Sequence, residues 1–476
     1  MAEPARADTA DVDLRTRELL EAPLIRLMAR LAAPNALVMM TTTCIGLIEL
    51  YFVAKLGVDS LAGVSQVFAI VSLISALSQG AVGGGVVSAV ARALGRGQRQ
   101  EANDLVWYAI AIAVPLGLVT TAALLIGGPS LYTAMGARDA SLQAALHYSN
   151  LVFGSAVLTW LFYLLLAVVR GTGNLVLSAA VVCGGALLLV PLLPVLIVGW
   201  GPVPGLGIIG GAVGMLFYFA IGSLIFATYL WGGWGVLSPP IRPPRFSFRP
   251  IWQILRVSGM STLISGTTSG TIAILTGFVG AHGVAAIAGY ATGARLEFLL
   301  PSLSYGIGGP VGILVGTNIG AGNIRRAVQA AWIGVAFAAI AAEAIGLVVA
   351  IWPDLWLRAF SDDPTVLAVG ATYLRTVGPF FGFFGAGFAL YMAGQGTGHL
   401  QWPASGALAR AAIGIAGGLL AFQFNGGLVG IFVAAAIGMA TFGSVSVAGL
   451  VLRAGYQPPW SKAAHPVAST VRRAPA

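Results

Sequence analysis

The chain has 476 residues, of which 58% are hydrophobic and only 9% are charged, with a formal net charge of +9. A water-soluble domain carries about 25% charged residues, so this composition excludes a soluble globular protein and indicates that lipid covers most of the surface. The positive charge does not indicate nucleic-acid binding, because the Lys and Arg residues lie mainly in short segments between apolar runs.

Residues 1–25 carry charges of both signs and lack the short apolar core of a cleavable signal. We therefore expect 1–33 to be a cytoplasmic N-terminal segment, and the first apolar run to direct membrane entry. Twelve runs are long enough to span a bilayer as helices, which takes about 20 apolar residues. They lie near residues 34–55, 61–89, 104–127, 146–169, 175–199, 208–231, 251–279, 284–314, 327–352, 371–394, 403–423 and 428–452. Alternating strand patterns are absent, so the predicted fold class is an all-α polytopic membrane protein with twelve transmembrane helices.

The basic residues predict the orientation of these helices. If both termini are cytoplasmic, most of the Lys and Arg residues lie on the inner side, and the outer loops hold only Lys55, Arg138 and Arg358. Cytoplasmic loops of membrane proteins are enriched in Lys and Arg. We therefore expect a multi-pass protein of the inner (plasma) membrane with both termini in the cytoplasm.

An internal repeat divides the chain into two halves. The segment Arg170–Asn174 in the first half matches Gln395–His399 in the second. Further matches in nearly the same register relate 95–102 to 320–327, 129–132 to 353–356, and 211–215 to 435–439. Because the offset equals six helices, the halves run parallel and are related by a pseudo-two-fold axis along the membrane normal.

The repeat defines the expected domains. They are an N-lobe over 34–236, a Pro- and Arg-rich cytoplasmic linker over 237–250, a C-lobe over 251–453 and a cytoplasmic tail over 454–476. Two parallel six-helix lobes enclose a cleft, and such lobes typically rock about a central site in alternating access. A duplicated scaffold without a transport pathway is the alternative, and the repeat favours a transporter.

Several segments, in order, resemble the multidrug and toxic compound extrusion (MATE) family. They are Phe52–Gly57 leading to Leu61–Gly63, Gly201–Ile208, Arg295–Glu297, Val315–Gly322 and Gly394–Gly398. The resemblance covers almost the whole chain, from about 25 to 453. It implies a secondary antiporter that exports drugs or other small organic compounds, often cationic, driven by a proton or sodium gradient. It also implies a membrane-embedded protein with no further cofactor, and we expect a monomer.

Acidic residues inside the predicted helices are the first candidates for coupling, because a charge within the membrane is costly and usually functional. Glu49 lies about two turns from the outer end of the first helix. The resemblance places it where the family usually has Asp, the proposed cation-binding carboxylate of the N-lobe. The polar residues that join this carboxylate in many members are here Leu189 and Leu193, so we expect an incomplete N-lobe relay.

Glu297 and Arg295 form the second candidate site. They are two residues apart on one helix and therefore point in different directions. Glu297 is either a second coupling carboxylate tuned by Arg295, or one half of a structural ion pair. Glu343 we interpret as a packing-face acid, and Arg410 as a structural residue near a helix end.

Scattered polar and aromatic residues within the helices are candidates for lining the cleft. Individually such groups more often form interhelical hydrogen bonds, and as a set they suit organic cations. They are Thr42, Gln66, Gln79, Tyr163, Tyr218, Thr267, Thr268, Tyr290 and Tyr391.

Other functions find little support in the sequence. It has no phosphate-binding loop and no His spacing typical of a metal site, so we expect no nucleotide, no metal and no enzymatic activity. A lipid-linked oligosaccharide flippase of the same superfamily is the main alternative, although such proteins often have extra helices and a more charged cleft. A major-facilitator transporter also has six plus six helices, but residues 91–97 lack the acid of its loop signature.

Overall fold

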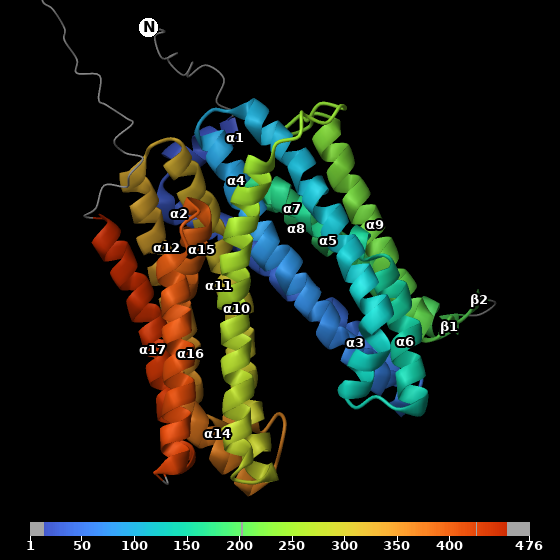
Figure 1. The fold of residues 1–476 in the computed structure, drawn as a ribbon, viewed down its shortest axis with the longest axis vertical. Coiled ribbons are helices and arrows are strands. Elements are labelled where there is room, and N and C mark those ends of the chain that lie inside the picture. Colours follow the sequence, from blue (N-terminus) through green and yellow to red (C-terminus); the bar gives the residue numbers. More distant parts are fainter. Residues whose placement is uncertain (1–13, 201–202, 425, 455–476) are drawn as a thin grey trace, which may run out of the picture.

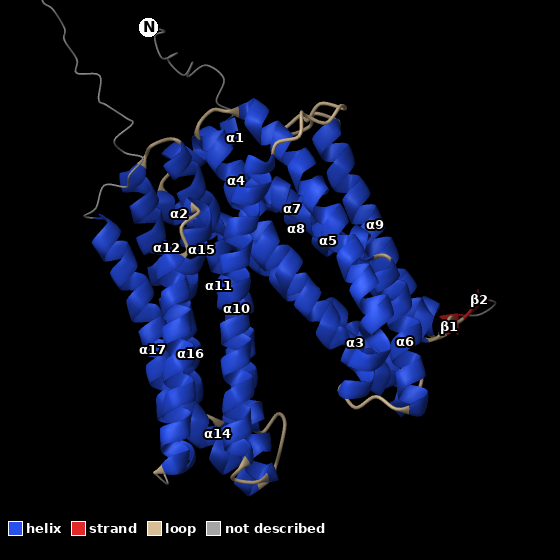
Figure 2. Ribbon diagram, viewed as in Figure 1, coloured by secondary structure: helices blue, strands red, loops and turns tan. Residues whose placement is uncertain are grey.

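The computed structural model describes residues 14–200, 203–424 and 426–454, and these residues are mostly helical (Figures 1 and 2). The first half comprises α1 (Leu14–Glu21), α2 (Leu24–Ala54), α3 (Val58–Ser75), the π-helix η2 (Ala76–Val82), α4 (Gly83–Gly95), α5 (Arg99–Ala134), α6 (Asp139–Gly154), α7 (Ala156–Gly171), α8 (Leu175–Ile197) and α9 (Ile208–Trp231). The second comprises α10 (Phe248–Gly280), α11 (Val284–Gly320), α12 (Ile324–Ile351), α13 (Asp354–Leu357), α14 (Pro364–Val377), the 3₁₀-helix η3 (Gly378–Phe380), α15 (Phe381–Thr397), α16 (Gln401–Gln423) and α17 (Gly427–Ala454).

The helices fit the predicted number of membrane spans. Within the described residues, 11 spans are long and apolar enough to cross a membrane, and the bent pair α6–α7 makes 12 if it counts as one. The axes of α6 and α7 differ by 51°. The only strands described are β1 (Gly199–Trp200) and β2 (Val203–Pro204), an antiparallel hairpin between α8 and α9. The all-α fold class is therefore confirmed, with this hairpin as a small addition.

The first spanning helix begins earlier than the hydrophobic run suggests. It starts at Leu24 rather than near residue 34, and Pro34 lies inside it. Leu27, Met28 and Leu31 are buried in one apolar cluster with residues of α11 and α12. The segment expected over 1–33 thus includes α1 and the start of α2, while residues 1–13 and the tail 455–476 lie outside the described residues.

The two halves form two lobes joined mainly through α11, which packs against α2 and α4 of the first lobe. In Figure 1 the lobes approach each other at the end that carries α1 and the connection from α9 to α10. They diverge toward the opposite end, where α14 and the connection from α5 to α6 lie. The two lobes are therefore closest at the end that carries α1.

The backbone reproduces the repeat found in the sequence. The repeat-related helices α7 and α15 end at Gly171 and Thr397, and each is followed by a glycine with positive φ. These glycines are Gly173 (φ 80°) and Gly398 (φ 77°), a left-handed conformation that glycine adopts without steric cost. The two copies of the repeated motif thus use the same helix-ending turn.

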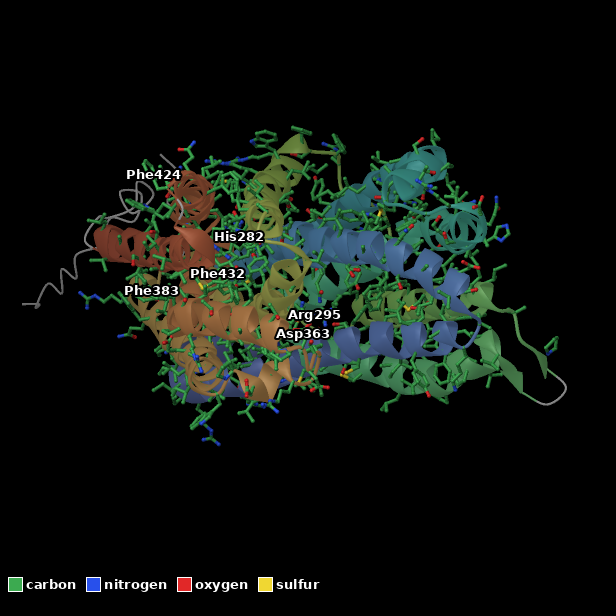
Figure 3. The ribbon with its side chains drawn as sticks, turned by 90° about the horizontal axis from the view of Figure 1, so that it is seen from below. His282, Arg295, Asp363, Phe383, Phe424 and Phe432 are labelled. Atoms are coloured by element: carbon green, nitrogen blue, oxygen red, sulfur yellow. The ribbon has the colours of Figure 1, made fainter. Side chains whose placement is uncertain are left out.

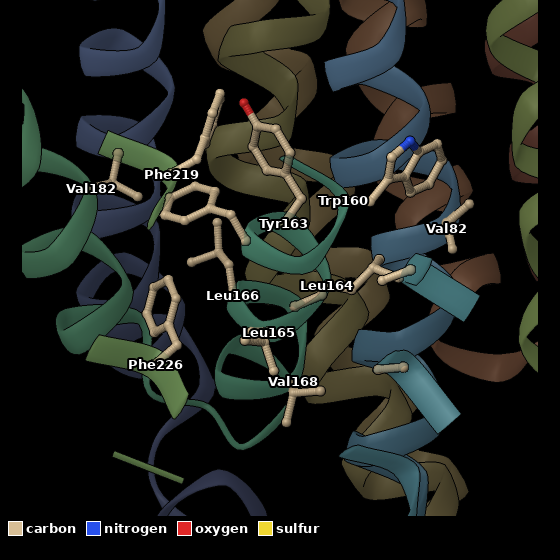
Figure 4. Close-up of a cluster of buried hydrophobic side chains, with 14 of the residues drawn as sticks. Val82, Trp160, Tyr163, Leu164, Leu165, Leu166, Val168, Val182, Phe219 and Phe226 are labelled. Atoms are coloured by element: carbon tan, nitrogen blue, oxygen red, sulfur yellow. The ribbon is translucent and has the colours of Figure 1, made fainter. Parts of the chain in front are cut away.

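The core of the first lobe is centred on α7. Leu164, Leu166 and Val168 are almost completely buried, and Figure 4 shows Leu166 beside Phe219 and Phe226 of α9. Phe162 lies 5.3 Å from Phe219 and 5.7 Å from Phe226 between ring centroids. This packing holds α7 and α9 together, and both helices contribute residues to the cavity described next.

Candidate functional site

A cavity of about 790 Å³ lies between the two lobes. The first lobe contributes side chains from α2, α3, η2, α6, α7 and α9, and the second lobe from α10, α11, α15 and α17. Its polar and charged lining includes Thr42, Glu49, Gln79, Tyr148, Tyr163, Tyr218, Thr268, Glu297 and Tyr391. Both acidic candidates from the sequence therefore meet in a single inter-lobe space.

Glu49 lies in the cavity wall on α2 and is only 3% exposed. The Tyr148 hydroxyl of α6 donates a hydrogen bond of 2.5 Å to Glu49 Oε1. On the other side, α9 passes so close at Gly211 that a Cβ added there would lie 2.7 Å from the same oxygen. Among the described salt bridges none involves Glu49, so its polar contact is a neutral hydroxyl.

Leu189 and Leu193, which the sequence placed at the relay positions, are almost completely buried beside Gly214 on α9. They offer no polar group to Glu49. The hydroxyl of Tyr148 supplies the polar contact from α6 instead. A different helix thus takes over the role of stabilising the N-lobe carboxylate.

Glu297 lies on α11 in the opposite wall and is 5% exposed. Its carboxylate forms an ion pair with Arg410 of α16, whose side chain is equally buried. The Tyr373 hydroxyl of α14 donates a second hydrogen bond of 2.7 Å to Glu297 Oε2. Unlike Glu49, the Glu297 carboxylate is paired with a positively charged side chain.

The expectation that Arg295 tunes Glu297 is wrong, whereas the expectation that the two do not pair with each other holds. The Arg295 side chain is exposed (Figure 3), and its guanidinium lies 4.8 Å from the centre of the Phe360 ring. Arg410, interpreted from the sequence as a structural residue near a helix end, is buried and provides the counter-charge. Residues two apart on a helix point about 200° apart, so Arg295 turns away while Glu297 faces the cavity.

Six of the nine candidate lining residues do line the cavity, namely Thr42, Gln79, Tyr163, Tyr218, Thr268 and Tyr391. Three others do not. The Gln66 amide reaches the Met135 carbonyl at 3.4 Å, and the Thr267 hydroxyl bonds back to Ile264 O within its own helix. Tyr290 is buried behind Glu297, stacked on Phe432.

Aromatic rings make up much of the remaining wall. They include Phe68, Phe153, Phe219, Phe384, Phe388 and Phe442. Flat apolar surfaces with a few polar groups bind planar organic molecules by stacking and burial, and rings beside carboxylates also favour cations. The cavity therefore suits small aromatic compounds.

Glu343 lies outside this cavity, in an apolar groove between α12, α15 and α17. Its carboxylate accepts a hydrogen bond of 2.7 Å from the backbone N–H of Gly382. The 3₁₀ break at Gly378–Phe380 makes Gly382 part of the first turn of α15, where backbone N–H groups lack intrahelical partners. This contact agrees with the interpretation of Glu343 as a packing-face acid.

Sequence reasoning missed Tyr148, Tyr373 and the position of Arg410. All three act on carboxylates that are far away in the chain, at separations of 99, 76 and 113 residues. One signal was available, since Arg410 is a permanent charge inside an apolar run and such a residue needs a buried partner.

The comparisons with known proteins agree with this two-lobed architecture. The family model described as MatE matches residues 34–195 and 265–420, which is most of both lobes. The chain belongs to the MatE family. A MatE protein is a multi-pass membrane transporter, so the predicted family and the predicted transport role are confirmed.

Relatives of this MatE chain carry transporter names. It is 26% identical to a FAD transporter of Shewanella oneidensis over 73% of this chain and 77% of that protein. It is 22% identical to a probable multidrug resistance protein NorM of Thermotoga maritima, over 80% and 81% of the two chains. It is 25% identical to the multidrug resistance protein PmpM of Pseudomonas aeruginosa, over 72% of each chain.

Solved MATE structures share the fold. A structure described as MATE in the bent conformation matches with a TM-score of 0.86 and 21% identity, covering 93% of this chain and 98% of that one. The outward-facing conformation of a multidrug resistance MATE family transporter matches with a TM-score of 0.83 and 20% identity, over 93% and 98%. At this level of identity the likeness establishes the arrangement of the helices.

Proposed function

We propose that the protein is a secondary antiporter that exports small organic compounds in exchange for protons or sodium ions. The two lobes would expose the cavity of Glu49 and Glu297 alternately to the two sides of the membrane. The observation that carries the proposal is the state of Glu49: a buried carboxylate in the wall of an inter-lobe cavity, with a neutral donor and no described salt bridge.

The coupling role follows from the cost of that charge. A carboxylate that is buried without a counter-ion is stabilised when it gains a proton or a sodium ion. Binding of the ion neutralises the Glu49 carboxylate and so changes which contacts this side chain makes with the cavity wall. The affinity for the ion and the position of the lobes therefore depend on each other. We therefore assign the first coupling site to Glu49.

Glu297 is proposed as a second, weaker coupling site. Its charge is already compensated by Arg410, so an incoming cation must displace this ion pair. The carboxylate still faces the cavity and is within reach of a cationic substrate. In this arrangement Glu49 is the main binding site of the driving ion, and the driving ion competes with a cationic substrate for Glu297.

The proposed substrate class rests on the residues of the cavity wall and on the names of similar proteins. Aromatic rings and two carboxylates favour planar organic cations, and two of the relatives, NorM and PmpM, are named for multidrug resistance. A second candidate is a flavin nucleotide, because one relative is named a FAD transporter and a flavin ring also stacks on aromatic side chains. Lipid-linked oligosaccharide is the third class to test.

We propose the inner membrane as the location, with both termini in the cytoplasm. The end of the molecule that carries α1 also holds the α9–α10 connection, with Arg242 and Arg245. Basic residues accumulate on the cytoplasmic side of membrane proteins. The lobes diverge at the other end, so the cavity would open outward in this conformation.

Transport in liposomes tests the function directly. The purified protein is reconstituted, a pH or sodium gradient is imposed, and the movement of ethidium, FAD or a fluorescent lipid-linked oligosaccharide is followed. Gradient-driven uphill movement of ethidium or FAD supports the proposal and identifies the substrate class. Movement of the lipid-linked sugar alone, independent of both gradients, would replace it with a flippase function.

A further inference from the structure

The repeated motif of the sequence is not explained by the cavity. Arg170 and Gln395 are the first residues of the two motif copies, and neither lines the large cavity. Both instead line a small space of about 20 Å³ at the contact between the lobes. Both are also strongly buried, each with 4% exposure.

Gln395 connects its helix α15 to the first lobe. Its side-chain amide donates hydrogen bonds of 3.0 Å to the Gly80 carbonyl and to the Ser261 hydroxyl of α10. Gly80 belongs to the π-helix η2, in which the widened turn disturbs the normal pairing of backbone carbonyls. The bond from Gln395 thus satisfies an irregular carbonyl of the first lobe with a donor of the second.

Tyr305 of α11 adds a parallel contact to the same π-helix. Its hydroxyl donates a hydrogen bond of 3.2 Å to the Gln79 carbonyl, next to the Gly80 carbonyl used by Gln395. Gln79 and Tyr391 also line the large cavity, whereas Tyr305 and Gln395 line the small one. The contacts of Tyr305 and Gln395 with η2 therefore close the large cavity on the side of the small one.

Arg92 of α4 crosses the lobe boundary in the other direction. Its guanidinium donates hydrogen bonds of 2.8 Å to the Gly396 carbonyl and 3.3 Å to the Gln395 carbonyl. Within α4 it also reaches the Ser88 hydroxyl at 3.0 Å. Among the described residues Arg92 forms no salt bridge, so carbonyls of the second lobe provide its partners.

Arg170 reaches the second lobe through Asn35. The guanidinium donates a hydrogen bond to Asn35 Oδ1 and lies 5.7 Å from the centre of the Tyr305 ring. The Asn35 amide in turn donates to the Tyr305 carbonyl at 2.8 Å and to the Gly306 carbonyl at 3.0 Å. A buried charge is thus held by a neutral amide and an aromatic face, without a carboxylate in any described salt bridge.

The backbones of α4 and α11 touch beside these side chains. A Cβ at Gly95 would collide with the Thr317 carbonyl, and a Cβ at Gly320 would collide with the Arg92 carbonyl. Gly95 and Gly320 are themselves equivalent positions of the repeat. The backbone contact is therefore symmetric, and together with the hydrogen bonds it lies beside the apolar cluster that α2 shares with α11 and α12.

We propose that Asn35, Arg92, Arg170, Tyr305 and Gln395 form a lock that closes the transport pathway at the end carrying α1. Arg92 has two carbonyl acceptors on the opposite lobe and Arg170 has the Tyr305 ring there, and the guanidinium groups keep these contacts only while the lobes touch. When the lobes separate at this end, water replaces the carbonyls and the arginines line the newly opened entrance. Each hydrogen bond makes only a small net contribution to the free energy of the contact, because water replaces it when it breaks, so such a contact can open in every transport cycle.

Cysteine labelling tests the lock without substrate or ion gradient. Cys44 and Cys183 are replaced by Ser, and Val87→Cys, at the small cavity, reports access from the α1 end. Ser302→Cys, in the large cavity, reports access from the opposite end. Each is labelled with a membrane-impermeant maleimide added to one side of oriented vesicles.

Loss of the hydrogen bonds that one of these side chains makes is expected to shift a two-state equilibrium about tenfold. Arg92→Gln, Arg170→Gln and Gln395→Leu should therefore raise labelling at Val87→Cys about tenfold and reduce it at Ser302→Cys. Arg96→Gln is the matched control, because Arg96 lies one turn beyond Arg92 and, within the described residues, its side-chain hydrogen bonds go to Gln98 and Glu101 of its own lobe. It should change neither rate.

Two outcomes would overturn the lock. Unchanged labelling at both reporters in Arg92→Gln and Gln395→Leu would show that these contacts do not hold the pathway shut. A parallel rise at both reporters would show local unfolding instead of an exchange between two open ends. Because the assay involves neither transport nor a gradient, its result is independent of whether the antiport proposal is correct.

Discussion

Arg410 of α16 forms a buried ion pair with Glu297 of α11, 113 residues earlier in the chain, and both side chains are 5% exposed. Arg410→Met leaves the carboxylate buried without its counter-charge. Loss of one partner of a buried ion pair typically lowers stability by about 3–5 kcal/mol. Equilibrium unfolding in detergent should show a loss of this size.

Two further variants check the cause. The double variant Glu297→Leu, Arg410→Met removes both charges and should recover most of the lost stability, because an apolar pair often replaces a buried ion pair without cost. Arg295→Met is the control, since Arg295 is exposed over the Phe360 ring, and it should change stability little. Equal losses in Arg295→Met and Arg410→Met would contradict the assignment of the ion pair.

Tyr148→Phe removes the donor to Glu49 Oε1 and keeps the ring. A hydrogen bond to a charged group is worth about 1.5–3 kcal/mol, so we expect gradient-driven transport to fall about tenfold or more. Initial rates of uphill efflux from proteoliposomes measure this. Tyr51→Phe is the control, because Tyr51 lies on α2, the helix of Glu49, but its side chain is 61% exposed. An equal loss of transport in both variants would argue against the contact between Tyr148 and Glu49.

Gly211→Ala tests the packing of α9 against the same carboxylate. The added Cβ would lie 2.7 Å from Glu49 Oε1, so the Glu49 side chain must move. Overpacking of this kind costs about 1–3 kcal/mol, and we expect most of the uphill transport to be lost. At Gly184 an added Cβ meets nothing within 4 Å, and Gly184→Ala should transport at the parent rate. Normal transport in Gly211→Ala would show that the position of Glu49 is not critical.

Glu343→Ala should affect stability more than transport. It removes the acceptor for the Gly382 N–H in the first turn of α15, a loss that costs about 1–2 kcal/mol. Glu343→Gln keeps an acceptor oxygen and should lose less. Thermal unfolding ranks the three proteins, and a transport defect in Glu343→Gln at unchanged stability would instead give this acid a functional role.

The sequence located the two cavity carboxylates more successfully than it predicted the residues around them. Glu49 and Glu297 stand out in the sequence because a charged residue within an apolar run is costly to place in the membrane. Both line the cavity in the structure. Their partners Tyr148 and Arg410 come from helices that only the tertiary fold brings close. Helical periodicity did show that Arg295 and Glu297 diverge, but it could not show which of them faces the cavity.

For the helices too, the sequence predicted some features and missed others. Hydrophobic length located the spans, whereas the early start of α2 at Leu24 was missed because Arg26 and Arg30 interrupt the apolar run. The repeat at Arg170 and Gln395 was visible in the sequence, and its place between the lobes was not. Local pattern predicts elements well, and contacts between distant segments depend on the packing of the whole chain.

The most direct test of the account is to compare uphill transport with substrate exchange in Glu49→Gln. The amide keeps the shape of the side chain but can neither gain a proton nor hold a sodium ion by charge. Proteoliposomes with an imposed gradient report the uphill step, and equal substrate on both sides reports exchange. If Glu49 couples the driving ion to transport, Glu49→Gln loses uphill transport and keeps exchange. Uphill transport at the parent rate in Glu49→Gln would contradict coupling at this carboxylate.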